Sequence, residues 1–276
     1  MIPFLHIGRL AIPTFGLMVA AAMVAAYFVL RADLRRRGYA ERATQLAEAF
    51  IAIPCLAGII GAKVYHVLET PRELWEHPAR ELFSQFGFAW FGGLIAGLGA
   101  FVWLARREKI PLLAILDGAS PAAALGYGIG RIGCLLAGDG DYGIPTSLPW
   151  GMSFPNGLVP TDQRVHPTPI YEFLAACAIA WVLWRIGARQ IAAARGAGRA
   201  SRDERAAPAD GIAAASGIVF AAYLILTGAA RFLVEFIRIN PRSFFGLTNA
   251  QAASAASVIA GVVIWLWARR RGRRAE

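Results

Sequence analysis

The sequence is poor in cysteine, with only Cys55, Cys134 and Cys177 among 276 residues. Because their number is odd and no two lie close together, they form no CxxC motif, no zinc-binding pattern and no disulfide framework. The start of the chain lacks a basic leader and a cleavage site, so the first apolar stretch is expected to stay in the protein as a membrane span. No internal repeat is evident, which argues against the inverted-repeat architecture of many transporters.

Acidic residues are also in the minority. The chain has 18 Asp and Glu against 28 Lys and Arg, a net charge of +10, yet 57% of its residues are hydrophobic and its mean hydropathy is +0.49. A soluble protein this apolar would have more core than its surface could cover, whereas a membrane protein exposes apolar side chains to lipid. Strong basicity can indicate nucleic-acid binding, but here the basic residues form short runs between apolar stretches, and we expect no nucleic-acid partner.

Seven stretches approach the roughly 20 mostly apolar residues that a membrane-spanning helix needs. We therefore predict an all-α polytopic membrane protein with about seven transmembrane helices, forming one domain over residues 1–276. The predicted spans are 12–30, 46–68, 88–104, 112–129, 170–186, 212–232 and 250–268.

Basic clusters follow the first, third, fifth and seventh predicted spans. Because clustered Lys and Arg mark cytoplasmic loops, we expect the N-terminus outside and the C-terminus in the cytoplasm. Segments 69–86, 130–169 and 238–247 then face outward, and 130–169 is rich in glycine. Residues 189–210 are polar and poor in large apolar side chains, which predicts a mobile cytoplasmic linker.

Most arginines are explained by this topology, but Arg131 and Arg231 stand within or directly after apolar spans. A charge at the centre of a span costs roughly 2.5–3.5 kcal/mol on insertion scales, so such a residue is a candidate for function. Glu235 follows Arg231 by one helical turn and can pair with it, with Arg238 three residues further on. The pattern fits either an ion-pair ladder at the membrane interface or an anion site, because guanidinium groups bind phosphate well.

Two more polar segments lie on the predicted outer side. The glycine-rich one contains Asp139 and Asp141, but the oxygen-ligand spacing of an EF-hand calcium loop is missing. The other contains His166 and Glu172 at the start of the fifth span. Taken alone, His166 is explained as a loop residue and Glu172 as an acid that the helix dipole favours in a first turn. Each segment by itself therefore leaves structural and functional roles open.

Taken together, these segments resemble the bacterial prolipoprotein diacylglyceryl transferase family over nearly the whole chain. The matching segments follow one another in the same order as in the family. The GRIG and RFLVEFIR segments are specific to the family when they occur together. The matching segments are Phe91-Gly92-Gly93-Leu94-Ile95-Ala96-Gly97, Gly130-Arg131-Ile132-Gly133 with its continuation to Gly143, His166-Pro167-Thr168-Pro169-Ile170-Tyr171-Glu172, Arg231-Phe232-Leu233-Val234-Glu235-Phe236-Ile237-Arg238 and Gly246-Leu247-Thr248-Asn249-Ala250-Gln251.

The resemblance implies an enzyme of the bacterial cytoplasmic (inner) membrane. It would transfer the diacylglyceryl group of phosphatidylglycerol to the lipobox cysteine of a prolipoprotein, forming a thioether and releasing glycerol phosphate. Arg131, Arg231 and Glu235 would be catalytic, the arginines by stabilising the leaving phosphate. No metal or organic cofactor is implied. The implied lipid-binding set is Arg131, Arg231, Arg238, Gly92, Gly93, Gly133, Asp139, Gly143, His166 and Glu172.

Several polar positions depart from the family's pattern. Phe91 stands where the family often has histidine, Cys134 where it often has asparagine, and Phe15 and Thr227 where it has aromatic hydroxyls. The proton acceptor for the thiol is therefore open: His166 is one candidate, and the few per cent of thiolate that a free cysteine supplies at neutral pH is another. Two alternatives remain for the function, namely a lipid-binding or lipid-modifying paralogue with another acceptor, and an anion transporter.

Overall fold

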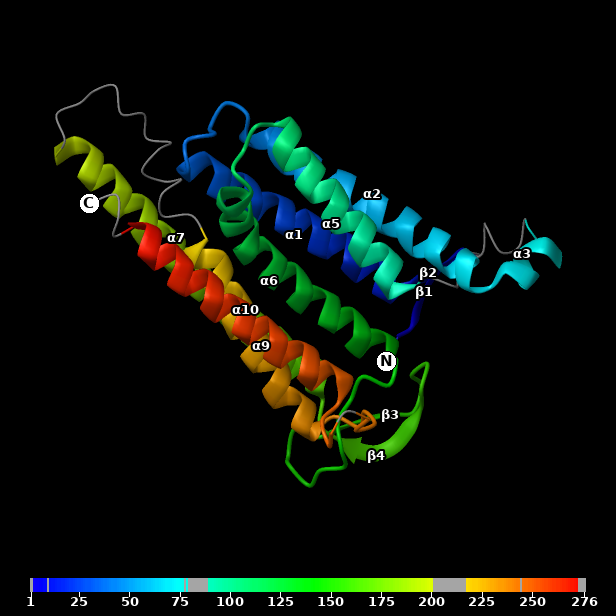
Figure 1. Ribbon diagram of the computed structural model, residues 1–276. Coiled ribbons are helices and arrows are strands. Elements are labelled where there is room, and N and C mark those ends of the chain that lie inside the picture. The colour runs from blue at the N-terminus through cyan, green and yellow to red at the C-terminus, as the bar shows by residue number, and fades with distance from the viewer. Residues whose placement is uncertain are drawn as a thin grey trace.

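Helices make up most of the computed structural model, which describes residues 2–8, 10–76, 78, 89–200, 217–243 and 245–272. Figure 1 shows them side by side in an elongated bundle. The helices are α1 (Thr14–Arg36), α2 (Ala43–Glu69), α3 (Pro71–Glu76), α5 (Trp90–Arg107), α6 (Leu112–Ala137), α7 (Thr168–Ala200), α9 (Ile218–Val234), the 3-10 helix η1 (Glu235–Ile237) and α10 (Asn249–Gly272).

Among the described residues, six helices are long and apolar enough to cross a membrane, namely α1, α2, α6, α7, α9 and α10. The third predicted span corresponds to α5, which has 18 residues, ends on Arg106 and Arg107 and is not among these six. This confirms the prediction of an all-α protein that crosses the membrane several times. Six of the seven predicted spans thus coincide with helices of this kind, and the third coincides with α5, which packs against α2.

Helix α6 lies between two groups of helices (Figure 1). It packs along α1 on one side, next to the closely paired α2 and α5, and along α7 and α9 on the other, next to α10. The pair of α9 and α10 is close because its contact is made by glycine. A Cβ atom at Gly228 of α9 would come within 2.8 Å of the Ser254 carbonyl oxygen, and one at Gly261 of α10 within 2.8 Å of the Ala221 carbonyl oxygen. Small residues that let helix backbones approach are typical of packing inside membranes.

Helices α2 and α5 approach each other still more closely. This close approach explains why two positions of the predicted lipid-binding set are glycine. A Cβ atom at Gly92 would lie 2.3 Å from both the Gly61 carbonyl oxygen and the Tyr65 Cβ atom, and one at Gly93 would lie 3.2 Å from the Gly58 carbonyl oxygen. In this structure Gly92 and Gly93 therefore serve helix packing. Whether they also bind lipid stays a prediction.

Substitution of Gly92 by alanine is expected to destabilise the protein by about 1–3 kcal/mol, because the added methyl group overpacks the α2–α5 contact. The measurement is thermal unfolding of the purified protein in detergent. Gly99→Ala on the same helix is the matched control, since a Cβ atom at Gly99 would meet nothing within 4 Å among the described residues. Equal unfolding temperatures for the two variants would show that the close contact contributes nothing to stability.

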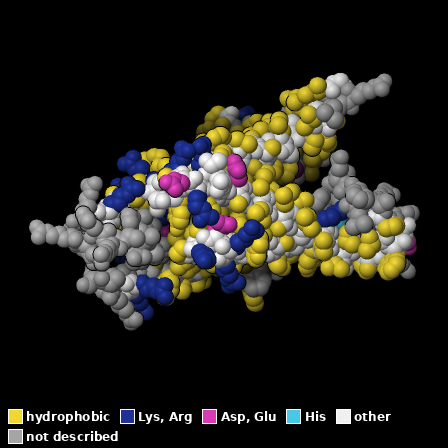
Figure 2. Space-filling view, turned by 90° about the horizontal axis from the view of Figure 1, so that it is seen from above, with side chains coloured by type: hydrophobic (Ala, Val, Ile, Leu, Met, Phe, Trp, Pro, Cys, Tyr) yellow, Lys and Arg dark blue, Asp and Glu magenta, His cyan; other side chains and the backbone are white. Residues whose placement is uncertain are grey.

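The basic residues at the end of α1 form specific contacts within the protein, including contacts with α7. Asp33 is fully buried and forms ion pairs with Arg36 and Arg37. Arg36 also stacks on the Trp184 ring of α7, 3.7 Å from its centroid, and donates to the Trp184 carbonyl oxygen at 3.0 Å. Figure 2 shows most of the Lys and Arg side chains in view gathered toward this end, while hydrophobic side chains cover much of the remaining face.

Two helices differ from their predicted extents. Helix α7 continues past the predicted end of the fifth span to Ala200, so the predicted linker at 189–210 begins as helix, and 201–210 lie outside the described residues. Helix α9 begins at Ile218, where the buried Asp117 carboxylate of α6 accepts hydrogen bonds from the backbone N–H groups of Gly217 and Phe220 at 2.7 and 2.8 Å. Asp117 thus caps α9 from a neighbouring helix, satisfying donors that a helix start leaves open.

Two small antiparallel sheets lie outside the helices. The first pairs β1 (Phe4–Ile7) with β2 (Leu10–Pro13), and the second pairs β3 (Met152–Phe154) with β4 (Thr161–Val165). Phe154 and Val165 pack with Tyr142 in a small core of their own. A single bridge joins Gly143 to Arg238. The glycine-rich segment, whose first residues end α6, is thereby held against the residues that follow α9.

Candidate active site

Arg131, Arg231 and Arg238 converge at one end of the bundle although they come from different segments. Arg131 lies near the end of α6, Arg231 in the last turn of α9, and Arg238 directly after η1. Their side chains are 12%, 27% and 5% exposed. The structure thus brings together the three arginines that the sequence singled out.

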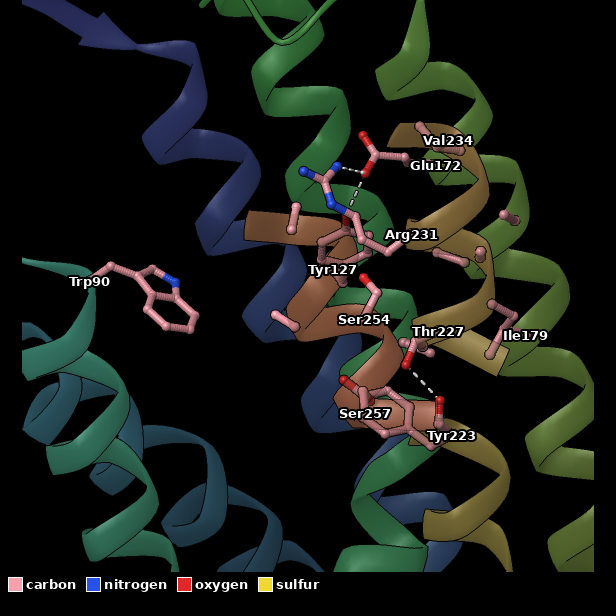
Figure 3. Close-up of a pocket in the computed structure, with 17 residues that line it drawn as sticks. Trp90, Tyr127, Glu172, Ile179, Tyr223, Thr227, Arg231, Val234, Ser254 and Ser257 are labelled. Atoms are coloured by element: carbon pink, nitrogen blue, oxygen red, sulfur yellow. Dashed lines mark hydrogen bonds and ion pairs between the residues drawn. The ribbon is translucent and has the colours of Figure 1, made fainter. Parts of the chain in front are cut away.

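Glu172, just after the first turn of α7, is the carboxylate that these arginines share. Its Oε2 atom lies 2.6 Å from Arg131 Nη2 and 3.3 Å from Arg238 Nη1, and its Oε1 atom lies 2.7 Å from Arg231 Nη1. The Tyr127 hydroxyl also donates to Oε1 at 2.6 Å (Figure 3). Glu172 is 4% exposed. A buried carboxylate must be paired to be tolerated, and here three cations and a hydroxyl pair it.

A second acid of this cluster is Asp141. It pairs with Arg131 Nη1 at 2.5 Å and with Arg238. Burial raises the pKa of the Asp141 carboxyl, but the charges of Arg131 and Arg238 more than offset that effect, so its pKa lies below the ordinary value. Asp141 therefore stays ionised at neutral pH. Because a depressed pKa favours the folded state only while the group is ionised, its contribution to stability is lost as the pH falls through that lowered pKa.

Glu235 completes the cluster from η1. Its Oε2 atom lies 3.0 Å from Arg231 Nη2, as the one-turn spacing predicts, and 3.7 Å from Arg238 Nε. The Asn240 side-chain amide donates to Oε1 at 2.6 Å. Three arginines thus face three carboxylates, those of Asp141, Glu172 and Glu235, and the formal charges of this group cancel. We call these six residues the arginine–carboxylate cluster.

A cavity of about 420 Å³ lies beside the cluster. Residues of α6, α7, α9 and α10 line it together with Trp90 of α5, which lies apart from the other lining side chains (Figure 3). Figure 3 shows Arg231 and Glu172 at one end of the cavity and Tyr223 and Ser257 at the other. Most of the lining side chains between them are small or apolar. The cavity is therefore charged at one end and apolar along its length.

The remaining residues of the predicted lipid-binding set surround the cluster without entering it. A Cβ atom at Gly143 would lie 2.4 Å from the Ile237 carbonyl oxygen, and one at Gly133 would lie 3.1 Å from Phe15 Cδ2. Both glycines thus permit close contacts. The Asp139 carboxylate accepts the Asp141 backbone N–H at 3.2 Å. His166 Nδ1, in the loop before α7, lies 3.2 Å from the Tyr171 hydroxyl of that helix.

Two residues were not in the predicted site, namely Asp141 of the cluster and Tyr127, which donates to Glu172. Asp141 shares its glycine-rich segment with Asp139, and the sequence alone does not say which acid faces Arg131. Tyr127 precedes Arg131 by four residues, a spacing that places both on one helical face, and this spacing is the signal that could have identified it. The Arg131 guanidinium also lies 5.9 Å from the centroid of the Tyr127 ring.

The positions that depart from the family's pattern take other contacts. The Cys134 sulfur accepts a hydrogen bond from Arg131 Nη1 at 3.4 Å, and the Thr227 hydroxyl donates to the Tyr223 carbonyl oxygen at 2.6 Å. Phe91 is 62% exposed and packs edge-on against Trp90. Cys134 therefore still contacts the first arginine, whereas Phe91 offers no hydrogen-bonding group.

One group of side chains has the composition of a metal site. Cys134, Asp139 and Asp141 can bring one ligand atom each within 4.8 Å of one another. The Asp141 carboxylate, however, is already shared by Arg131 and Arg238. Two adjacent guanidinium groups repel a cation, so these residues fit a metal ion poorly.

Comparison with known proteins assigns the family. The sequence model of the family described as "Prolipoprotein diacylglyceryl transferase" matches residues 3–267. Three similar proteins, each named phosphatidylglycerol–prolipoprotein diacylglyceryl transferase, come from Paracidovorax citrulli, Clostridium tetani and Geobacter sulfurreducens. They are 30%, 31% and 32% identical to this chain, over 98%, 91% and 88% of its length and 96%, 91% and 84% of their own. By these matches over nearly its whole length, the chain belongs to the prolipoprotein diacylglyceryl transferase family.

Proposed function

We propose that this protein transfers the diacylglyceryl group of phosphatidylglycerol to the lipobox cysteine thiol of prolipoproteins, the first step of lipoprotein maturation. The single observation that carries the proposal is a cluster of three arginines beside a mostly apolar cavity, with one of them, Arg231, lining the end of that cavity. An anionic phospholipid has the same arrangement, a phosphate attached to acyl chains. The names of the family's other members support this substrate pair.

The hydrogen bonding of the cluster leaves capacity for an anion. An arginine has five N–H donors in a fixed plane, and Arg131 Nε is buried with no hydrogen-bond partner among the described residues. Arg231 has the most exposed side chain of the three arginines and lines the cavity. We infer that the phosphate binds between Arg131 and Arg231, with Glu172 and Glu235 orienting their side chains.

The proposed reaction is a displacement at the glyceryl carbon that bears the phosphate. The thiolate sulfur forms the new C–S bond while the C–O bond to phosphate breaks, and the electron pair of that bond leaves with the phosphate oxygen. Glycerol phosphate is released. Guanidinium N–H groups placed around the phosphate would stabilise the charge that grows on it in the transition state.

The displacement requires that the thiol lose its proton. Phe91 supplies no base, and His166, in the loop before α7, contacts the Tyr171 hydroxyl of that helix. We infer that the prolipoprotein thiol loses its proton to solvent before the displacement, because a free thiol already supplies a few per cent of thiolate at neutral pH. Arginines close to the sulfur would raise that fraction.

We propose that the protein lies in the bacterial cytoplasmic membrane with the arginine–carboxylate cluster toward its outer side. Clustered basic residues end α1, α5 and α10, whereas the arginine–carboxylate cluster lies at the other end of the bundle. The positive-inside rule places the basic ends in the cytoplasm. Phosphatidylglycerol and the signal peptide of a secreted prolipoprotein would both reach the cluster from the membrane.

The proposal is tested by expressing the chain in a bacterium depleted of its own transferase, together with a tagged prolipoprotein. Mass spectrometry is expected to show the prolipoprotein gaining one diacylglyceryl group, and a variant prolipoprotein with serine for the lipobox cysteine is expected to gain none. Consumption of phosphatidylglycerol without this gain would favour a paralogue with another acceptor. Efflux of a phosphate ester from vesicles without lipid consumption would favour the anion-transporter alternative.

A further inference from the structure

A second cavity, of about 360 Å³, lies among α2, α5, α6 and α9. Its lining is almost wholly apolar, with Leu94, Leu98 and Phe101 on α5 and Leu116 on α6. Two of the lining side chains are polar, those of Ser120 and Tyr223. The Ser120 hydroxyl already donates a hydrogen bond to the Leu116 carbonyl oxygen at 2.6 Å. The chemistry of this cavity therefore suits a hydrocarbon chain.

Tyr223 lines both cavities. On α9, Arg231, Thr227 and Tyr223 follow one another at four-residue intervals, and all three line the first cavity. On α6 the first cavity is lined by Ala124 and Tyr127, and the second by residues from Ala123 back to Leu116, further from Arg131. The second cavity therefore adjoins the first on the side away from the arginine–carboxylate cluster, with the Tyr223 side chain at the junction between them.

The depth of this junction corresponds to the length of an acyl chain. Eight residues of α9 separate Arg231 from Tyr223, which is about 12 Å along a helix. One leaflet takes up half of a hydrocarbon core roughly 30 Å thick, or about 15 Å. A chain that extends inward from a phosphate at Arg231 thus reaches Tyr223 shortly before its end.

We propose that Tyr223 sets the length of acyl chain that the enzyme accepts, with the second cavity receiving the terminal methylene groups of longer chains. This inference rests on the proposed function. The occupant is one acyl chain of the lipid whose phosphate lies at Arg131 and Arg231, because the first cavity joins that charged end to the apolar second cavity. The Tyr223 ring stacks on Phe220, with centroids 6.3 Å apart and planes 17° apart, so the ring is held at the junction.

The test offers the purified enzyme an equimolar mixture of saturated phosphatidylglycerols, from lauroyl to stearoyl, together with a prolipoprotein peptide. The mass of the lipidated peptide reports which chains were transferred, so every variant gives an internal ratio. Tyr223→Ala is expected to raise the stearoyl-to-lauroyl ratio about fivefold and Tyr223→Trp to lower it about fivefold, the effect of removing or adding a modest overpacking cost. Tyr223→Phe should leave the ratio unchanged, because the ring remains.

Two further variants separate this role from general damage. Ala123→Leu narrows the second cavity from α6 and is expected to lower the ratio while Tyr223 stays in place. Phe232→Ala removes an aromatic ring of α9 that lines neither cavity and should not change it. Unchanged ratios in the alanine, tryptophan and Ala123→Leu variants would overturn the inference. If the wild-type enzyme transfers no chain of any length, the proposed function itself fails, which is a distinguishable result.

Discussion

Replacement of Arg231 by alanine is expected to lower the rate of diacylglyceryl transfer by at least about a hundredfold, the usual effect of removing a donor that stabilises transition-state charge. Arg231 has the most exposed side chain of the cluster's arginines and stands where the cavity meets the cluster. Its loss also leaves Glu235, among the described residues, with only the more distant Arg238 as an ion-pair partner. The measurement is the initial rate at which a prolipoprotein peptide gains diacylglyceryl mass in detergent with phosphatidylglycerol. Arg131→Ala should behave in the same way.

Two variants make the Arg231 result specific. Arg242→Ala removes an exposed arginine outside the cluster and should retain nearly full activity. Arg231→Lys keeps the charge but loses the planar pair of donors, so it should fall between the wild type and Arg231→Ala. Full activity of Arg231→Ala would show that the phosphate does not depend on this residue.

Glu172→Ala is expected to have the largest effect on stability of any single substitution in the cluster. Removing one partner from a buried ion pair typically costs about 3–5 kcal/mol, because the remaining charge stays buried without compensation. Here Arg131, Arg231 and Arg238 all lose a carboxylate at once. We expect a markedly lower thermal unfolding temperature in detergent and no measurable transfer.

The isosteric Glu172→Gln variant distinguishes charge from shape. It keeps the size and shape of the side chain but not its negative charge. Its unfolding temperature should therefore lie between those of the wild type and Glu172→Ala. Asp162→Asn removes an exposed carboxylate on β4 and should unfold like the wild type. If Glu172→Ala unfolds at the wild-type temperature, the cluster is not what holds α6, α7 and α9 together at this end.

The spans and the two leading arginines could be predicted because each leaves a local signal. A membrane helix is an apolar run of fixed minimum length, and the cost of a charge in such a run draws attention to Arg131 and Arg231. The Arg231–Glu235 pair also follows from one-turn spacing, and the structure contains it. These features depend only on residues that are close in the sequence.

The partners across helices could not be predicted, because they depend on how distant segments pack. Glu172 lies more than forty residues from Arg131, and its three arginine contacts exist only after α6, α7 and α9 have come together. The choice of Asp141 over Asp139 depends on the path of a glycine-rich loop. The packing role of Gly92 depends on Gly61 lying opposite on α2. The sequence marks such residues as small or charged but does not say what they face.

Helix α9 is fixed at both of its ends. Asp117 of α6 binds its first turn, and Glu172 of α7 binds Arg231 in its last. Because Gly228 and Gly261 hold α10 close against it, the two helices form a rigid wall of the cavity. The pair of α2 and α5 forms another rigid unit, packed through its own glycines. Trp90 of α5 lines the same cavity, so the cavity is bounded by two separately packed helix pairs, and a change in its width is expected to come from movement of one pair relative to the other.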